Sequence, residues 1–245
     1  MQFLRFLTLL LQIPAVFAAI NGPDTFHWAG KLPPGQIIEI KGVNGAIHAL
    51  PAEGQTVEVI AQKTGQSSDP SEIQVKVLEH ERGVTVYAVY PSSLNGNDVD
   101  VDFLVRVPPG VRFIGRTVNG AVEASRLNAD AEAHSVNGDI RLSTSGTARA
   151  ETINGSIQAA IGKVIDAATF STSNGGITLE IGAGAHADIH ARTVNGAISA
   201  NVPLTIRGRL VSKRADGRIG GGGPELNLNT VNGTIRLYQT CDFSM

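Results

Sequence analysis

Cysteine is almost absent from this chain of 245 residues, and Cys241, close to the C-terminus, is the only one. A single thiol excludes a disulfide framework within one molecule. It leaves open a disulfide between two chains, although a terminal cysteine of this kind is more often incidental. The fold therefore has to be held without internal cross-links.

Large aromatic side chains are also scarce, at 5% of the residues, whereas glycine occurs 28 times. A core built from Ala, Ile, Leu and Val is narrow, because few side chains are large enough to fill a wide one. Neither sign of charge dominates: 20 basic and 22 acidic residues give a formal net charge of −2. This balance, with no basic cluster that carries interleaved aromatics, predicts no nucleic-acid partner and no attraction to anionic lipid.

Long hydrophobic runs are missing except at the start of the chain. Residues 1–19 are predicted to be a signal peptide, with Arg5 as the positive region, an apolar stretch from Phe6 to Phe17, and small residues at Ala18 and Ala19 for cleavage. The stretch is too short to cross a membrane. We therefore expect an exported protein, periplasmic or secreted to the cell surface, that does not span the membrane.

What the chain does have is a repeated motif, nearly always Val/Ile-Asn-Gly-x-Ile/Val. Its seven asparagines are Asn44, Asn119, Asn137, Asn154, Asn174, Asn195 and Asn232. From Asn119 onward they are 18, 17, 20, 21 and 37 residues apart, and a degenerate copy at residues 215–219 divides the last gap into 21 and 16. A period near 20 residues with one corner per unit is typical of stacked coils.

Apolar and variable residues alternate after each corner. Ile or Val stands three positions after every asparagine, as at Ile140 and Ile157, which predicts a strand with its apolar side inward. A second strand is expected before each corner. There a Thr or Ser stands two positions before most of the asparagines, and the sequence leaves open whether this hydroxyl or the next residue faces inward.

The Asn-Gly pair itself indicates a sharp turn, because glycine accepts positive φ and asparagine tolerates the left-handed region. Stacked corners would bring successive asparagines to a separation of about 4.8 Å. Their amides would then form a hydrogen-bonded ladder, and a buried amide that loses its partner costs about 1–3 kcal/mol. We therefore interpret all seven asparagines as a structural ladder and not as ligand-binding residues.

These patterns predict an all-β fold, a β-helix or solenoid of roughly 18–21-residue coils with an antiparallel β insertion that caps its N-terminal end. One domain is expected over residues 20–240, followed by a tail at 241–245. Its first coil covers about 31–50, the antiparallel strands about 55–107, and the stacked coils about 108–240. Phe26 and Trp28 are expected to pack at the cap.

Three groups of residues are candidates for a metal or ligand site. His186, Asp188 and His190 alternate on one strand face, but Arg192 beside them disfavours a metal. Asp98, Asp100 and Asp102 also share a face, without the Gly and Glu that an EF-hand loop requires. The run at residues 220–223 lacks the Gly-Lys-Ser/Thr of a phosphate loop. We therefore predict no catalytic, cofactor-binding or metal-binding residues.

The Val-Asn-Gly-x-Ile repeat resembles that of the bacterial "putative adhesin" family of exported β-strand-repeat proteins, whose domain has no assigned function. Three further segments support the resemblance: Val107–Gly110, Thr144–Gly146 and Ile219–Gly223. The resemblance implies a β-helix-like fold, export and a role in adhesion, and it brings no catalytic or ligand residues with it.

The favoured function is a non-enzymatic structural or interaction module at the cell envelope, with a surface protein or a glycan as its partner. The alternative is a carbohydrate-active β-helix enzyme that acts on polysaccharide. Such an enzyme gathers carboxylates in a groove across several coils. The outward column Glu123, Arg141, Gln158, Thr178 and Ser199 places no two acids on neighbouring coils, which argues against this alternative.

Overall fold

The computed structural model describes residues 20–22, 24–65, 68–92, 99–208 and 212–240. The predicted signal peptide, the tail with Cys241 and Asp98 lie outside these ranges. The described chain is all-β, as predicted, apart from a single turn of 3-10 helix at Pro70–Glu72, and no helix in it is long and apolar enough to cross a membrane.

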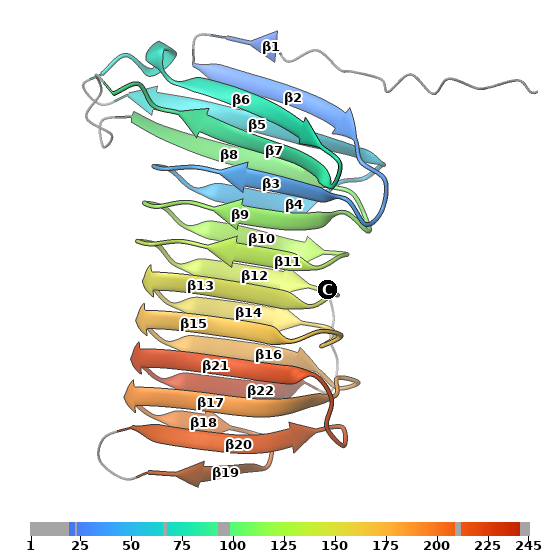
Figure 1. The fold of residues 1–245 in the computed structure, drawn as a ribbon, viewed down its shortest axis with the longest axis vertical. Helices are drawn as coiled ribbons and strands as arrows, with labels where there is room; N and C mark the ends of the chain where they lie inside the picture. Colours follow the sequence, from blue (N-terminus) through green and yellow to red (C-terminus); the bar gives the residue numbers. More distant parts are fainter. Residues whose placement is uncertain (1–19, 23, 66–67, 93–98, 209–211, 241–245) are drawn as a thin grey trace, which may run out of the picture.

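Two sheets of eleven strands each face one another along the molecule (Figure 1). Sheet A contains, in spatial order, β1 (Ile20–Asn21), β2 (Thr25–Lys31), β5 (Thr56–Gly65), β8 (Val99–Val107), β4 (Ile47–Pro51), β10 (Val122–Leu127), β12 (Ile140–Thr144), β14 (Ile157–Ile161), β16 (Ile177–Gly182), β22 (Ile235–Thr240) and β18 (Ile198–Ala200). Sheet B contains β19 (Leu204–Arg207), β20 (Lys213–Ile219), β17 (Ala187–Asn195), β21 (Glu225–Asn232), β15 (Ala168–Asn174), β13 (Ala148–Asn154), β11 (Ala131–His134), β9 (Arg112–Arg116), β3 (Ile37–Lys41), β7 (Gly83–Val89) and β6 (Gln74–His80).

Between residues 112 and 200 the chain alternates between the sheets, and each Asn-Gly corner joins a strand of sheet B to one of sheet A. Strands from successive repeats pair in parallel, so that Ile140 lies beside Ile157, and Ile157 beside Ile177. These three side chains are fully buried. The sheet B strands turn small or apolar residues toward them, such as Ala133, Ala150 and Phe170, which gives the narrow core that the composition predicts.

Antiparallel strands cover the N-terminal end, at the top of Figure 1. There β2, β5 and β8 pair antiparallel, as do β6 and β7, while β7 and β8 continue the stack by pairing in parallel with β3 and β4. Phe26 and Trp28 are 3% and 6% exposed in β2, so their predicted packing at this end is confirmed. The end of the stack therefore gains antiparallel partners for its backbone.

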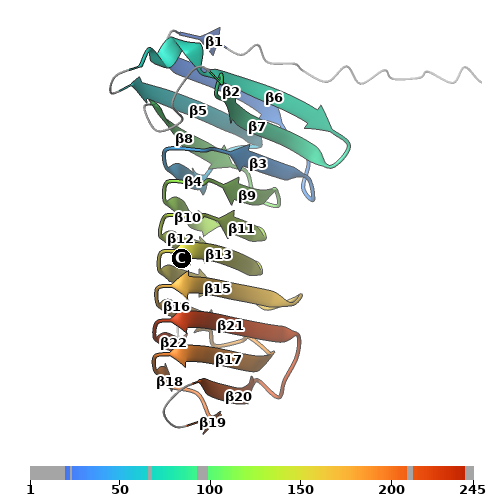
Figure 2. The same cartoon turned by 60° about the vertical axis from the view of Figure 1, so that its left-hand side comes forward.

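Strand order departs from chain order at the other end. The last pair, β21 and β22, lies between the β15/β16 pair and the β17/β18 pair, and both ribbon views show β21 between β15 and β17 (Figures 1 and 2). The expectation that coils stack in sequence order is therefore wrong here. The turn after β16 skips one position in the stack, and the chain returns later to fill it.

The degenerate copy at residues 215–219 is also not a corner. It lies within β20, which pairs antiparallel with β17, so that Ala215 faces Ala191 and Gly217 faces Ile189. Ile219 is buried, but in sheet B and not in the isoleucine column of sheet A. The motif was misread because a buried Ile after Asp-Gly satisfies the same alternation in either direction of pairing.

The hydroxyl column faces inward, and the residue after it faces out. All six Thr and Ser side chains of the column are buried. Each donates a hydrogen bond to a glycine carbonyl of a neighbouring corner, as from Thr172 Oγ1 to Gly155 O at 2.8 Å and from Thr152 Oγ1 to Gly138 O at 3.0 Å. The hydroxyls thereby satisfy backbone acceptors at the point where the strand ends.

The glycines of the corners are needed for close approach and not, in general, for positive φ. Only Gly45 among the seven has positive φ, so the turn geometry expected from Asn-Gly is wrong for the others. A Cβ atom on Gly155 would overlap the carbonyl oxygen of Gly138, and five more corner glycines lie equally close to a glycine of a neighbouring corner. Any side chain here would push two coils apart.

This geometry predicts that Gly155→Ala lowers the free energy of unfolding by about 2–3 kcal/mol, because the added methyl group overlaps the backbone of the neighbouring corner at Gly138. Gly184→Ala is the matched control, since a Cβ at Gly184 meets nothing within 4 Å. Its effect should stay within about 0.5 kcal/mol. Urea unfolding of the two variants measures the difference, and equal midpoints would contradict the close-approach explanation.

Candidate functional site

The seven predicted ladder residues lie in one line along the stack. Six amide hydrogen bonds join them, with Nδ2 to Oδ1 distances of 2.8–2.9 Å. Their spatial order is Asn44, Asn119, Asn137, Asn154, Asn174, Asn232 and Asn195. Their contribution to stability stays a prediction.

The ladder differs from expectation in its burial. Asn44 is 3% exposed, but Asn137, Asn154, Asn174, Asn195 and Asn232 are exposed. Their amides point outward because the inward position of the corner is already taken by the hydroxyl two residues earlier. Water competes for such amides, so each bond contributes at the lower end of the range for a hydrogen bond, about 0.5 kcal/mol.

Beside the ladder, the outer face of sheet B carries a continuous row of side chains in register. The row consists of Lys41, Arg116, His134, Glu151, Ser171, Asn229, Arg192, Arg214 and Arg207. Positive charge is concentrated at both of its ends. We call it the polar row, and its two ends differ in how their charges are neutralised.

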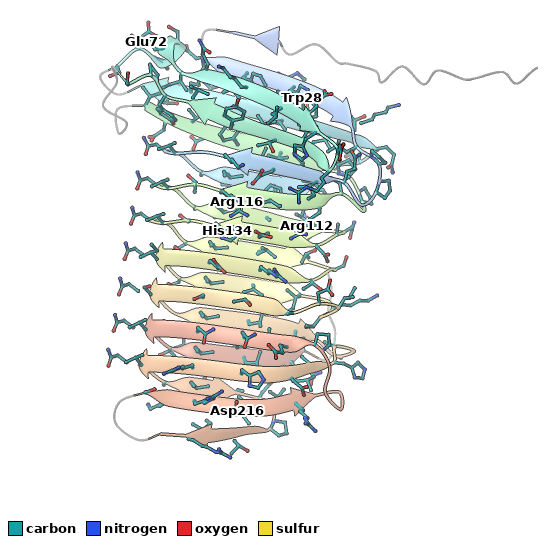
Figure 3. All side chains as sticks on the ribbon, in the orientation of Figure 1. Trp28, Glu72, Arg112, Arg116, His134 and Asp216 are labelled. Carbon is teal, nitrogen blue, oxygen red and sulfur yellow. The ribbon has the colours of Figure 1, made fainter. Side chains whose placement is uncertain are left out.

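At the N-terminal end of the polar row, cations and carboxylates form a closed network. Arg116 donates to Glu39 from Nε at 3.1 Å and to Glu132 from a terminal nitrogen at 2.7 Å. Arg112 and His134 also reach Glu132, at 2.8 and 2.7 Å. Figure 3 shows Arg112, Arg116 and His134 together on the face that β9 and β11 present.

These contacts set the protonation of Glu132. The hydrogen bond from His134, with the charges of His134, Arg116 and Arg112, lowers the pKa of Glu132 to about 2 against the opposing effect of burial. The pKa of Glu39 is also lowered, because its hydrogen bonds to Lys41, Thr85 and Arg116 outweigh desolvation. Both carboxylates are therefore ionised acceptors, and every cation of the network has a partner.

At the C-terminal end, the polar row crosses an open hollow of about 410 Å³. Its lining comes from β17, β20 and β21 and consists of His190, Ala191, Arg192, Arg214, Glu225, Asn227 and Asn229. His190 Nδ1 lies 2.9 Å from Asp216, which Figure 3 marks on β20. Arg214 Nε reaches the same carboxylate only at 3.5 Å.

The two groups of residues that were considered and rejected as metal ligands have other partners. Asp188 forms an ion pair with Arg218 at 3.2 Å, and His186 contacts the carbonyl oxygen of Gly220. Asp102 accepts a hydrogen bond from the backbone of Ala46 at 2.7 Å. In the described part of the chain, no three His, Cys, Asp or Glu side chains form a metal-binding group.

The run at residues 220–223 forms the turn from β20 to β21. Gly220, Gly221 and Gly222 all have positive φ, which explains the glycines without a ligand.

The sequence places Arg116 and Arg192 at the same outward position of the strand before the corner, but it did not identify Glu132, Arg207 and Arg214 as members of one surface with them. The sequence signal for such a surface is the alternation of charged residues with the small core residues along each strand. This signal does not show that Arg207 and Arg214 join the surface, because the register of β20 and β19 depends on an antiparallel return of the chain that no repeat spacing encodes.

The closed network generates a prediction about acid stability. Glu132 protonates near pH 4.5 in the unfolded chain but only near pH 2 in the folded protein, so stability is lost as the pH falls from 4.5 to 2. Glu132→Gln should lower the free energy of unfolding at neutral pH by about 1–2 kcal/mol, a value discounted for the half-exposed arginines. It should also flatten the acid limb of the stability curve.

Chemical unfolding across that pH range measures the effect, with Glu180→Gln on the exposed face of sheet A as the control. An acid limb of unchanged slope in Glu132→Gln would show that the network does not hold the carboxylate ionised.

Comparison with known proteins gives distant structural matches. A solved structure described as a putative cell adhesion protein from Clostridium sporogenes is 11% identical, with 87% of this chain and 99% of that chain covered and a TM-score of 0.49. One described as a putative adhesin from Bacteroides fragilis is 13% identical, with 89% and 98% covered and a TM-score of 0.39. No family model matches the chain, and no curated protein matches it. Similarity at this level carries no argument about function.

Proposed function

We propose that this chain is an exported β-solenoid that serves as a non-enzymatic structural or interaction module, adhesin-like, at the cell envelope. The observation that carries the proposal is the polar row, which presents side chains from nine neighbouring strands in register on one face. An extended face of this kind binds an elongated partner by many modest contacts. Export rests on the sequence of residues 1–19.

The carboxylates of the closed network at the N-terminal end of the polar row favour binding over hydrolysis. A glycosidase needs a general acid that is protonated near the working pH. Glu132, the most enclosed carboxylate of the closed network, has its pKa lowered to about 2, so it is ionised and cannot donate a proton at neutral pH. The polysaccharide-cleaving alternative would have to use other carboxylates.

A panel experiment tests the proposal. The purified chain is passed over immobilised acidic and neutral polysaccharides and over extracellular matrix proteins. New reducing ends are measured in the same samples. We expect retention on at least one polymer, reversed by free polymer, with the ligand unchanged. The heat-unfolded chain, which has lost the register of the row, is the control and should not be retained.

Two outcomes would contradict the proposal. Absence of retention on every polymer would remove the interaction role. Release of reducing ends that is abolished by Glu123→Gln, on the outer face of sheet A, would favour the enzyme, because Glu123 is the one carboxylate of the outward column considered above and forms an ion pair with Arg141.

A further inference from the structure

We infer that the C-terminal end of the polar row is a binding site for an acidic polysaccharide, whose carboxylate or sulfate groups are held by Arg192, Arg214 and Arg207. This inference rests on the proposed interaction role and specifies the ligand class. We call these three residues the arginine row. They stand at directly opposite positions on β17, β20 and β19.

The arrangement of the arginine row opposes stability. Like charges at directly opposite positions of neighbouring strands repel one another and destabilise a sheet. All three arginines are exposed, so no packing of the guanidinium groups offsets this repulsion. A ligand that carries negative charge across the three strands would remove it.

The two ends of the polar row give an internal comparison. Arg112 and Arg116 lie against Glu132 and Glu39 at 2.7–3.1 Å, so each of the two guanidinium groups is paired with a carboxylate. Within the described ranges, no carboxylate lies within 4 Å of Arg192 or Arg207, and Arg214 has only the 3.5 Å contact with Asp216. The guanidinium forks of the arginine row therefore remain available for bidentate contacts to carboxylate or sulfate.

The hollow beside the arginine row suits a sugar and not an apolar anchor. Asn227 and Asn229 supply amide donors and acceptors for hydroxyl groups, and His190 lies beside them. No Phe, Tyr or Trp lines it, which disfavours nucleobase stacking and the aromatic anchors typical of protein partners. Glu225 is the one carboxylate of the lining, and Asn227 Nδ2 lies 3.4 Å from it. Because Glu225 would repel the carboxylate or sulfate groups of the ligand, we expect those groups to lie over the arginines.

The test compares the binding of fluorescent polygalacturonate and heparin with that of neutral dextran and single-stranded DNA, at low and high salt. The double variant Arg192→Gln/Arg214→Gln should bind the acidic polysaccharides with an affinity lower by a factor of roughly ten or more, as expected for the loss of two charge-assisted contacts. Arg236→Gln, an exposed arginine on the outer face of sheet A, is the matched control and should change affinity less than about twofold.

Two further measurements distinguish a loss of binding from a loss of folding in the double variant. Its melting temperature should equal or exceed that of the wild type, because repulsion is removed, whereas Arg116→Gln should melt earlier. Arg192→Lys/Arg214→Lys keeps the charge but loses the planar fork, and it should retain salt-sensitive binding at an intermediate affinity. If the double Gln variant had a lower melting temperature than the wild type, the inference that repulsion between these arginines destabilises the sheet would be overturned.

Each binding result decides between the two proposals. Retention of dextran or a matrix protein without binding of either acidic polysaccharide would overturn the ligand class and leave the interaction role standing. Equal binding of DNA and heparin would overturn the choice of a polysaccharide. Binding of the acidic polymers that the Gln variant leaves intact would overturn the site. If the wild type bound no polymer at all, both proposals would fail.

Discussion

The close approach of successive Asn-Gly corners is the constraint on which the structure depends. The glycine N–H of one corner donates to the asparagine carbonyl of the next, as from Gly138 to Asn154 O at 3.0 Å. The buried hydroxyls donate to glycine carbonyls, and the exposed amides bond along the same line. Because the glycines leave no room for a side chain, the distance between corners is fixed. The alignment of the corners with one another in turn sets the register of the strands that flank them.

Fixed register decides what the outer face of sheet B can do. Residues at equivalent positions of each repeat become direct neighbours, so a row of charges forms without any loop to position it. At one end Glu39 and Glu132 neutralise the cations, and the row adds stability. At the other end three arginines stand at directly opposite positions and are exposed. The same register thus gives a row whose cations are neutralised at one end and left largely without carboxylate partners at the other, and the proposed binding role rests on that difference.

The return of the chain at the C-terminal end creates the second of these surfaces. Since β21 and β22 fill the position that the chain skipped after β16, β17 is displaced outward, where β20 can pair with it antiparallel. Arg214 reaches Arg192 only through this antiparallel pairing, and Asn227 and Asn229 reach the hollow only through the insertion of β21. The same asparagine spacing would have produced a different surface if the coils had stacked in chain order.

The sequence by itself determined the all-β class, the corners, the buried Ile and Val columns and the packing of Phe26 and Trp28, because these follow from local periodicity and side-chain volume. The inward side of the Thr column, the outward amides and the true reason for the glycines required coordinates, since they depend on the distance to another coil. The order of the coils and the direction of β20 were decided only by the tertiary structure. Alternation of period two looks the same for parallel and antiparallel neighbours, so nothing in a single strand specifies which strand will lie beside it.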